Sequence, residues 1–394
     1  MNVLQISTYP IVKPLHGGQI RVKEIQNELK KLGHKVRSIS FSEFSHKYFD
    51  EDLDFTISDA LLREVIKTPY SNDLATALAS VNNIEMERFL ERHLSSFEPD
   101  FIFIEQAWLW PLVKKILSKG KIKDKKVIYS SHNIEYLTKQ SIFSSNGIVD
   151  ECNVVNKIKD LEGDLCSHAY AVVGCTQADL HEFIELGAKR VILCPNGVAD
   201  QKVEQNVSQM IKELVGERKY ALFVGSAYPP NAQGFWSMLG NSMAWLKPDE
   251  MILAVGGCSL ILEDFAPEES KIFDFVNFDK IKRLGFVEND ELSALIFNAA
   301  QIILPITSGG GSNLKTAEAI IANKPVVATE MACRGYDNIK ELSNFFICNT
   351  QTEFINAVQR AFSTESKEIT QTEKLFRETV LWRNTLSGLK DIFN

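Results

Sequence analysis

The sequence predicts an α/β protein of two doubly wound domains, each with a parallel sheet between helices. A length of 394 residues exceeds what one hydrophobic core ordinarily organises. Short apolar runs alternate with helical patterns, an order typical of βαβ units. The runs are continuous rather than alternating, as expected for strands buried on both faces. This alternation occurs twice, on either side of a polar stretch at 200–218 that we interpret as a linker and a helix.

The first series of elements begins close to the N-terminus. A strand at 3–7 leads into a loop that contains Gly17 and Gly18, and a helix at 19–32 ends at Gly33, a residue type that favours the turn after a helix. The other expected elements are a strand at 36–41, helical segments within 57–97, strands at 101–104, 127–130 and 169–174, a helix at 176–187 capped by Thr176, and a strand at 191–194.

The second series has the same alternation. Its expected strands are 221–224, 251–255, 281–285, 302–304 and 325–328, and the chain closes with an amphipathic helix that contains Trp382. We therefore expect an N-terminal domain at 1–198, to which 372–394 returns, and a second domain at 199–371.

Composition excludes several functions. The net charge of −8 and the absence of a basic block do not favour nucleic acid as a partner. The N-terminus lacks the pattern of a signal peptide, and no apolar run reaches the roughly 18 residues of a membrane span. Seven scattered cysteines without C-x-x-C indicate reduced thiols. We expect no metal site, because Asp52-Leu53-Asp54 lies in an acidic run that we interpret as a solvated loop.

One stretch, residues 302–329, combines the residue types of an anion-binding site. It contains an apolar run, the loop SGGGSN, a helical pattern and the second apolar run KPVVAT. Free N–H groups and the dipole at the start of a helix favour an anion. Lys315 and Glu318 are three residues apart and share a helix face. A cation for phosphate and a carboxylate for sugar hydroxyls predict a nucleotide-sugar site. The alternative is a plain glycine turn followed by surface charges.

This stretch resembles the donor-site motif of GT-B glycosyltransferases of family 4, in the variant GGG-S/T-x-L-K-x-x-E-A. Weaker segments occur in the family's order: HGGQIR at 16–21, SHNIE at 131–135, CPNGV at 194–198, FVGSAYPPN at 223–231 and LGFV at 284–287. The resemblance covers most of the chain. It implies two Rossmann-like domains that face a cleft, with a C-terminal helix crossing back to the N-terminal domain.

The resemblance also implies which residues bind the donor nucleotide. Lys315 would pair with a phosphate, and Glu318 would accept hydrogen bonds from both ribose hydroxyls. The backbone near Gly285 reads the base in the family, although for Phe286 a plain buried strand is the alternative. The full set of donor candidates, besides Lys315, is Gly225, Gly285, Phe286, Val287, Gly310, Gly311, Ser312, Asn313, Leu314 and Glu318.

The chain departs from the family pattern in two places. Gly310 stands where the first glutamate of E-x7-E contacts the transferred sugar, which leaves the sugar open. The loop GSAYPPN lacks the Arg/Lys pair that many relatives direct at the diphosphate. We therefore expect Lys315 to neutralise more of the charge, with help from Arg21 across the cleft.

Candidates in the first domain lie in loops after expected strands. Gly17 and Gly18 open a helix, which suits a phosphate or a sugar hydroxyl. Arg21 lies one turn later, with a solvated helix charge as the alternative. His132 follows the strand 127–130 and resembles the family's cleft histidine, with a structural histidine as the alternative. Glu105 follows the strand 101–104 and is a candidate acceptor contact.

The resemblance implies a retaining, metal-independent glycosyltransferase. It would move a sugar from a UDP- or GDP-sugar to a hydroxyl of a glycan or lipid-linked acceptor, in bacterial surface polysaccharide synthesis, without a further cofactor. His132, Lys315 and Arg21 would be its catalytic residues. Two alternatives stay open: a nucleotide-sugar epimerase of the same architecture, and a catalytically silent GT-B partner subunit. We expect a cytoplasmic protein with peripheral contact at the inner face of the cell membrane.

Overall fold

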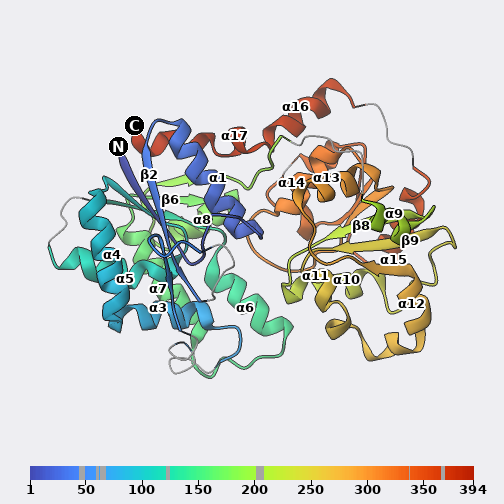
Figure 1. Ribbon diagram of the computed structural model, residues 1–394, viewed down its shortest axis with the longest axis horizontal. Coiled ribbons are helices and arrows are strands. Elements are labelled where there is room, and N and C mark those ends of the chain that lie inside the picture. The colour runs from blue at the N-terminus through green and yellow to red at the C-terminus, as the bar shows by residue number, and fades with distance from the viewer. Residues whose placement is uncertain are drawn as a thin grey trace. The chain divides into compact units, whose positions relative to one another are not determined.

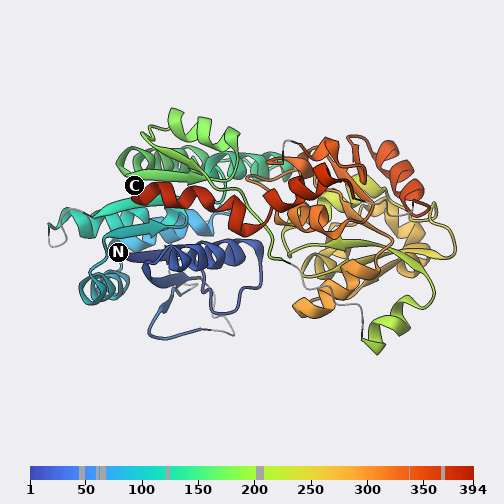
Figure 2. The same ribbon diagram turned by 90° about the horizontal axis from the view of Figure 1, so that it is seen from above.

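The computed structural model describes residues 1–43, 49–58, 62, 68–120, 125–200, 208–336, 338–364 and 369–394. The chain divides into two compact units. The first comprises Met1–Pro195 and Thr385–Asn394, and the second Asn196–Asn384. Figures 1 and 2 show that each unit has a twisted sheet with helices on both sides, which is the predicted class of two Rossmann-like domains.

The first unit contains, within its described residues, a parallel sheet in the order β3-β2-β1-β4-β5-β6-β7. Its strands are β1 (Asn2–Ser7), β2 (Lys35–Ser42), β3 (Asp54–Thr56), β4 (Phe101–Ile104), β5 (Lys126–Ser130), β6 (Ala171–Gly174) and β7 (Val191–Leu193). Its described helices include α1 (Gly17–Lys31), α3 (Asn72–Asn82), α4 (Ile84–Phe97), η1 (Ala107–Leu109), α5 (Trp110–Ser118), α6 (Glu135–Ser145), α7 (Val154–His168), α8 (Gln177–Glu185) and the C-terminal η6 (Ser387–Phe393).

The second unit contains, in the described part of the chain, a parallel sheet in the order β10-β9-β8-β11-β12-β13. Its strands are β8 (Lys219–Val224), β9 (Glu250–Val255), β10 (Ile281–Arg283), β11 (Gln301–Leu304), β12 (Val326–Thr329) and β13 (Phe345–Cys348). Its helices include α9 (Gln209–Val215), α10 (Pro229–Leu239), α11 (Cys258–Ile261), η3 (Glu268–Phe273), α12 (Asp274–Lys280), α13 (Asn289–Asn298), α14 (Leu314–Ala322), α15 (Gln351–Ala361) and α16 (Gln371–Thr379).

Both faces of the second sheet are buried, as the continuous apolar strands predict. Leu222 and Leu304 belong to the core cluster on one face, whereas Phe223 and Ile303 belong to the cluster on the other. Successive strand residues point to opposite faces, so an all-apolar strand requires cover on both. Helix ends are fixed locally: Thr176 and Asp179 form a capping box at α8.

The C-terminal residues return to the first unit. Residues 385–394 belong to it, and the ring of Phe393 packs on those of His34 and Phe101 at 4.0 and 4.9 Å. The return begins at Thr385 rather than at 372. Residues 372–384 group with the second unit because Glu373 accepts hydrogen bonds from Ser343 and the Arg377 guanidinium donates to Asn344.

The sequence analysis did not predict two short strands, β3 and β13. β3 begins at Asp54, the last residue of the acidic run at 50–54. Asp54 is not in a solvated loop as predicted: it is buried, and its carboxylate accepts a hydrogen bond from Ser40 Oγ at 2.7 Å. β13 is four residues long and only partly buried, so its pattern is weak. The helical segments expected within 57–97 include α3 and α4, while 59–61 and 63–67 lie outside the described residues.

No helix among the described residues is long and apolar enough to cross a bilayer. Six of the seven cysteines are buried, and Cys152 is exposed.

Candidate functional site

The sheet topology selects one edge of each sheet as the candidate site. Strand order reverses between β8 and β11 in the second unit, and between β1 and β4 in the first. Ligands of open α/β sheets bind outside the carboxyl ends of the strands at such a reversal. The glycine loop follows β11, and Gly225 follows β8, so these predicted residues lie at the reversal of the second sheet.

Side chains from other parts of the second unit fix the glycine loop, residues 308–313, by donating hydrogen bonds to its carbonyl groups. The Arg334 guanidinium donates to the carbonyl oxygens of Gly310 and Gly311, both at 2.5 Å. The Asn196 amide donates to the carbonyl of Ser312 at 2.7 Å, and the Tyr336 hydroxyl donates to that of Asn313 at 2.9 Å. Four successive carbonyls are therefore fixed by three side chains.

The backbone N–H groups of three residues of this loop have no acceptor in the part of the chain that the structure describes. Among the described residues, none accepts a hydrogen bond from the N–H of Gly310, Gly311 or Ser312. Gly311 has a φ of +60° and Gly309 a φ of +123°, values that favour glycine. Asn313 caps α14, its side chain accepting from Lys315 N, and Leu314 is the first helical residue. The arrangement offers N–H donors and a helix N-terminus to an anion.

Lys315 lies between this loop and the loop after β8. Its Nζ donates to Asn231 Oδ1 at 2.9 Å, and the Asn231 amide donates to the carbonyl of Ser226 at 3.0 Å. Burial lowers the pKa of the Lys315 ammonium, an effect that the nearby Glu318 opposes. The lysine is thus fixed by an amide rather than by a carboxylate, and no described carboxylate forms an ion pair with it.

Glu318 lies one turn along α14 from Lys315. It is half-buried, and its carboxyl group has no hydrogen-bond partner among the described residues. Burial raises its pKa to about 7, and Lys315 partly offsets that rise. A half-buried carboxylate without partners is costly unless a ligand supplies donors, and two sugar hydroxyls would do so.

Glycine at 225 and 257 is required by close packing. A Cβ at Gly225 would lie 2.8 Å from Cys258 Sγ and 3.4 Å from Lys315 Nζ, and one at Gly257 would lie 2.5 Å from the backbone N of Ala227. The glycines therefore bring the turns after β8 and β9 into contact beside Lys315.

The predicted base-reading segment is only partly available. Gly285 donates its N–H to Ser259 Oγ at 3.0 Å, and its carbonyl accepts from Gly256 N at 2.6 Å. Phe286 is exposed rather than in a buried strand, and Val287 is partly buried. A role in binding the base stays a prediction, and it falls on Phe286 and Val287 more than on Gly285.

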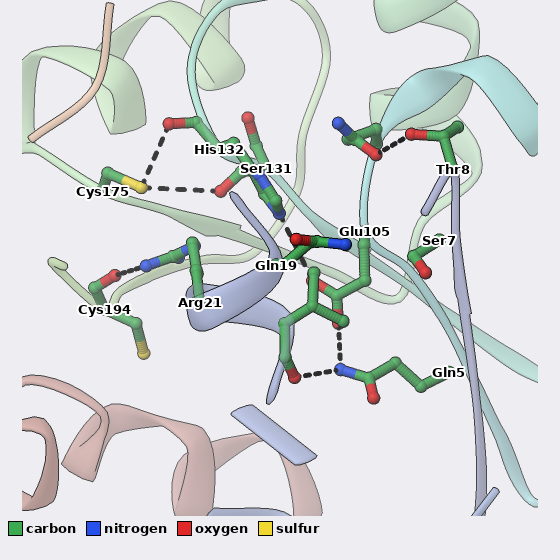
Figure 3. A network of polar contacts seen from close by, with 12 residues as sticks. Gln5, Ser7, Thr8, Gln19, Arg21, Glu105, Ser131, His132, Cys175 and Cys194 are labelled. Carbon is green, nitrogen blue, oxygen red and sulfur yellow. Dashed lines mark hydrogen bonds and ion pairs between the residues drawn. The ribbon is translucent and has the colours of Figure 1, made fainter. Parts of the chain in front are cut away.

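In the first unit, a polar cluster occupies the reversal between β1 and β4 (Figure 3). The Tyr9 hydroxyl lies 3.0 Å from His132 Nδ1, and His132 Nε2 lies 3.7 Å from Glu105 Oε2. Glu105 is fully buried, and its Oε1 accepts from Gln5 Nε2 at 2.5 Å. Because a carboxylate only accepts, it favours a proton on Nε2, so that Nδ1 accepts from Tyr9.

Burial sets the protonation of this cluster. It lowers the pKa of His132, against an opposing effect of Glu105, and it raises the pKa of Tyr9 well above its usual value. The imidazole is thus favoured neutral and the phenol stays protonated. Glu105 orients His132 from inside the unit, so its predicted contact with an acceptor stays a prediction without geometric support.

Gly17 and Gly18 begin α1 as predicted, and contact with Tyr9 explains why a glycine is needed at position 18. A Cβ at Gly18 would lie 2.4 Å from the Tyr9 hydroxyl, so glycine here permits the contact between Tyr9 and His132. His16 is the N-cap of α1, and its ring lies edge-on to Tyr9 at 4.9 Å. Binding of a phosphate by Gly17 and Gly18 stays a prediction.

Arg21 is not a solvated charge. Its side chain is 1% exposed, and its guanidinium donates to the carbonyl of Cys194 at 2.9 Å (Figure 3). This contact ties α1 to the end of β7. The predicted role of Arg21 toward a phosphate stays a prediction.

Sequence reasoning missed the side chains that hold the site. Asn196 and Asn231 lie in CPNGV and YPPN, segments that belong to the family resemblance, and Tyr9 lies in the loop after the first strand. Arg334 and Tyr336 follow β12 in CRGY and had no signal. No group of His, Cys, Asp and Glu suited to a metal occurs in the described part of the chain.

Comparison with solved structures identifies the architecture. Sucrose-phosphate synthase from Thermosynechococcus elongatus is similar over 100% of this chain and 98% of its own, with a TM-score of 0.73 at 12% identity. The E. coli trehalose-6-phosphate protein bound with UDP-2-fluoro glucose has a TM-score of 0.64 at 14% identity, covering 100% and 99% of the two chains.

A third similar structure is WaaG, a glycosyltransferase involved in lipopolysaccharide biosynthesis, with a TM-score of 0.61 at 13% identity over 100% of this chain and 98% of that one. The chain has the GT-B fold. At these identities the likeness concerns the fold alone. No protein-family model and no curated protein matches the sequence.

Proposed function

We propose that this chain is a glycosyltransferase that takes a sugar from a nucleoside-diphosphate sugar bound to its second unit. One observation supports this most strongly. At the reversal of the second sheet, backbone N–H groups that have no acceptor among the described residues belong to the loop that leads into the helix of Lys315 and Glu318. The N–H groups and Lys315 suit an anion such as a diphosphate, and Glu318 suits the two hydroxyls of a sugar.

The geometry of the loop and the sequence resemblance together support the proposed roles. The N–H groups of Gly310, Gly311 and Ser312 bind a phosphate, and the α14 dipole and Lys315 stabilise the charge that develops on the leaving diphosphate. Glu318 as a carboxylate accepts hydrogen bonds from the ribose hydroxyls. Phe286 and Val287 contact the base.

We assign the acceptor side to the first unit. Tyr9 is half-buried and His132 accepts a hydrogen bond from its hydroxyl, so this pair can contact a hydroxyl of the acceptor or of the transferred sugar. The acceptor oxygen bonds to the anomeric carbon as the bond to the diphosphate breaks, and the acceptor proton passes to the leaving phosphate. Lys315 and the N–H groups supply the charge that a metal would otherwise supply.

The finer assignments rest on the sequence resemblance. They are membership of family 4, retention of anomeric configuration, a UDP- or GDP-sugar as donor, and a glycan or lipid-linked acceptor of bacterial surface polysaccharide synthesis. Cytoplasmic location with peripheral contact to the inner face of the membrane belongs to the same proposal.

The test combines binding with turnover. Thermal midpoints are measured with UDP, GDP, ADP, TDP and CMP for the wild type, Lys315→Ala and Glu318→Ala, with the exposed Lys212→Ala and Glu217→Ala as matched controls. A ligand that binds only the folded state raises the midpoint. We expect one nucleotide to stabilise the wild type and both controls, and neither site variant.

Turnover then separates the enzyme from a silent subunit. The matching nucleotide sugar is incubated with the protein, and release of the nucleoside diphosphate is followed with and without candidate acceptors. Binding without release under any acceptor would favour the silent partner subunit, a reading motivated by Gly310 and the missing Arg/Lys pair. Absence of binding by every nucleotide would refute the donor site itself.

A further inference from the structure

The second unit exposes an unusual apolar helix face far from the donor site. Ile272, Phe275 and Phe278 are 83, 90 and 72% exposed, and they follow one another at three-residue spacing along η3 and α12. Figure 1 shows α12 at an edge of the second unit remote from α14. Three neighbouring large apolar side chains in water indicate an interaction surface.

The opposite side of this helix is firmly attached to the unit. Asn277 Oδ1 accepts from Met243 N at 2.9 Å, and its Nδ2 donates to the carbonyl of Asn241. Lys280 is buried, and its Nζ donates to the carbonyls of Lys247 and Glu250 at 2.6 and 3.2 Å. The exposed face is therefore presented by a fixed helix and cannot turn inward without breaking these bonds.

Charges on this face are arranged in mirror order about Phe275. Lys271 lies four residues before it and Asp279 four residues after it, whereas Ile272 and Phe278 lie three before and three after. Glu268 and Lys282 flank the face seven residues away on either side. Within α12, positions three and four residues apart share one helix face. Glu268, Lys271 and Ile272 lie in the 3-10 segment η3, where all three are exposed, and Lys282 lies in β10.

Lys282 belongs to the same face although its backbone is in β10. Its Nζ donates to the carbonyl of Phe278 at 2.9 Å and lies 5.0 Å from the centre of that ring. Glu268 and Lys271 pair with each other at 2.6 Å in the exposed η3 segment, and Asp279 pairs with Arg218 of the same copy at 3.3 Å. These three charges would therefore share their present partners with the second copy. Both ends of the face thus present charges of known sign next to its apolar centre.

We infer that the partner for this surface is a second copy of the same chain, bound through a two-fold axis at Phe275. An antiparallel pairing of the two exposed segments, each running from η3 through α12 to the start of β10, places Lys271 against Asp279, Ile272 against Phe278 and Glu268 against Lys282. Each of these pairs occurs twice, because a two-fold contact uses the same surface on both copies. Opposite charges then meet at each flank and apolar groups meet at the centre.

The expected dimer is weak. One helix pair covers less than the roughly 1,200 Å² of total surface that stable interfaces reach. A dissociation constant in the micromolar range is therefore expected. The charge order opposes a parallel pairing, which would place like charges together. The two acidic groups, Glu268 and Asp279, balance the two lysines, so the face has no net positive charge that would favour an anionic lipid surface.

Sedimentation equilibrium from about 1 to about 300 μM tests the dimer. We expect the wild-type mass to rise from 44.4 kDa toward twice that value, and Phe275→Ser to weaken association at least tenfold. Lys271→Asp and Asp279→Lys should each weaken it by a similar factor, and their combination should restore it. Val149→Ser, an exposed apolar residue of the first unit, is the control and should change nothing.

Cross-linking tests the position of the axis. In a Cys152→Ser background, which removes the exposed thiol, Phe275→Cys should form a disulfide dimer on mild oxidation. Asp279→Cys should not, because its two copies would lie about 12 Å apart along the helices. A wild type that is monomeric up to the highest concentration, or a dimer that survives Phe275→Ser, overturns the proposal. Vesicle binding lost in Phe275→Ser, without self-association, overturns it in favour of a lipid surface.

Discussion

The raised pKa of Glu318 predicts a pH dependence of donor binding. Burial raises this pKa to about 7 in the free protein. In the proposed site only the carboxylate can accept hydrogen bonds from both ribose hydroxyls. The apparent dissociation constant should then scale as one plus the ratio of protonated to ionised Glu318. This factor is about 11 at pH 6 and about 1.1 at pH 8, so the affinity should fall about tenfold, or about 1.4 kcal/mol, on acidification.

Isothermal titration calorimetry between pH 6 and pH 8 measures this directly. A nucleotide sugar is a suitable ligand because its diphosphate diester stays ionised over that range. At pH 7 about half of the Glu318 carboxyls are protonated, so binding should release about half a proton, detectable as a dependence of the heat on the buffer. Glu318→Gln should bind more weakly at pH 8 and show no such dependence.

Two results would refute this reasoning. One is a wild-type affinity that differs less than about twofold between pH 6 and pH 8. The other is a proton release that persists in Glu318→Gln. Glu217→Ala is the matched control and should keep the wild-type profile, since this residue is exposed and far in sequence from the loop.

Three further predictions concern the groups that support each site. Arg334→Gln should weaken diphosphate binding about tenfold, measured by calorimetry, because two loop carbonyls lose their donors; binding of the nucleoside alone should change less. Gly18→Ala should lower the free energy of unfolding by about 1–3 kcal/mol in urea titration, since its Cβ would displace the Tyr9 hydroxyl, whereas Gly163→Ala, with no atom nearer than 3.7 Å, should be tolerated. Burial raises the pKa of Glu162 to about 7, above its value in the unfolded chain. The folded state therefore favours the protonated carboxyl, and the stability that this protonation contributes is fully present below about pH 4.5 and is lost as the pH rises through 7. Glu162→Gln should flatten the dependence of the free energy of unfolding on pH in that range.

A specific result would contradict each of these three predictions. If Arg334→Gln lowered the affinity for the nucleoside as much as the affinity for the diphosphate, the guanidinium would not act through the loop. A Gly18→Ala variant as stable as Gly163→Ala would show that Tyr9 moves without cost. An unchanged pH profile in Glu162→Gln would assign the titration to another group, of which the buried Glu135 is the nearest candidate.

Local patterns explain what the sequence could predict. The stretch 302–329 was recognised as strand, loop, helix and strand because the change from continuous apolar residues to helical spacing is a property of neighbouring residues, and β11, α14 and β12 confirm it. The weak strands β3 and β13 were missed because three or four residues with polar or half-buried members give no distinct period.

Contacts between distant residues explain what it could not predict. Asn196 is 116 residues from Ser312, whose backbone it holds, and Tyr9 is 123 residues from His132. Arg21 has the sequence pattern of a surface charge on a helix, yet it is buried because a carbonyl 173 residues away accepts its hydrogen bond. Which polar residue finds such a partner depends on the folded sheet order, and a single sequence does not contain that information.

The anchoring of the glycine loop has a consequence for protein engineering. Arg334, Asn196 and Tyr336, which fix its carbonyls, all lie outside the segment 302–329 that contains the motif. A transplant of that segment into another scaffold would transfer its glycines, its lysine and its glutamate, but its peptide planes would be free to rotate. The recipient would then lose binding free energy to the ordering of the loop at every encounter with a ligand. A working graft must therefore bring the three anchors with it.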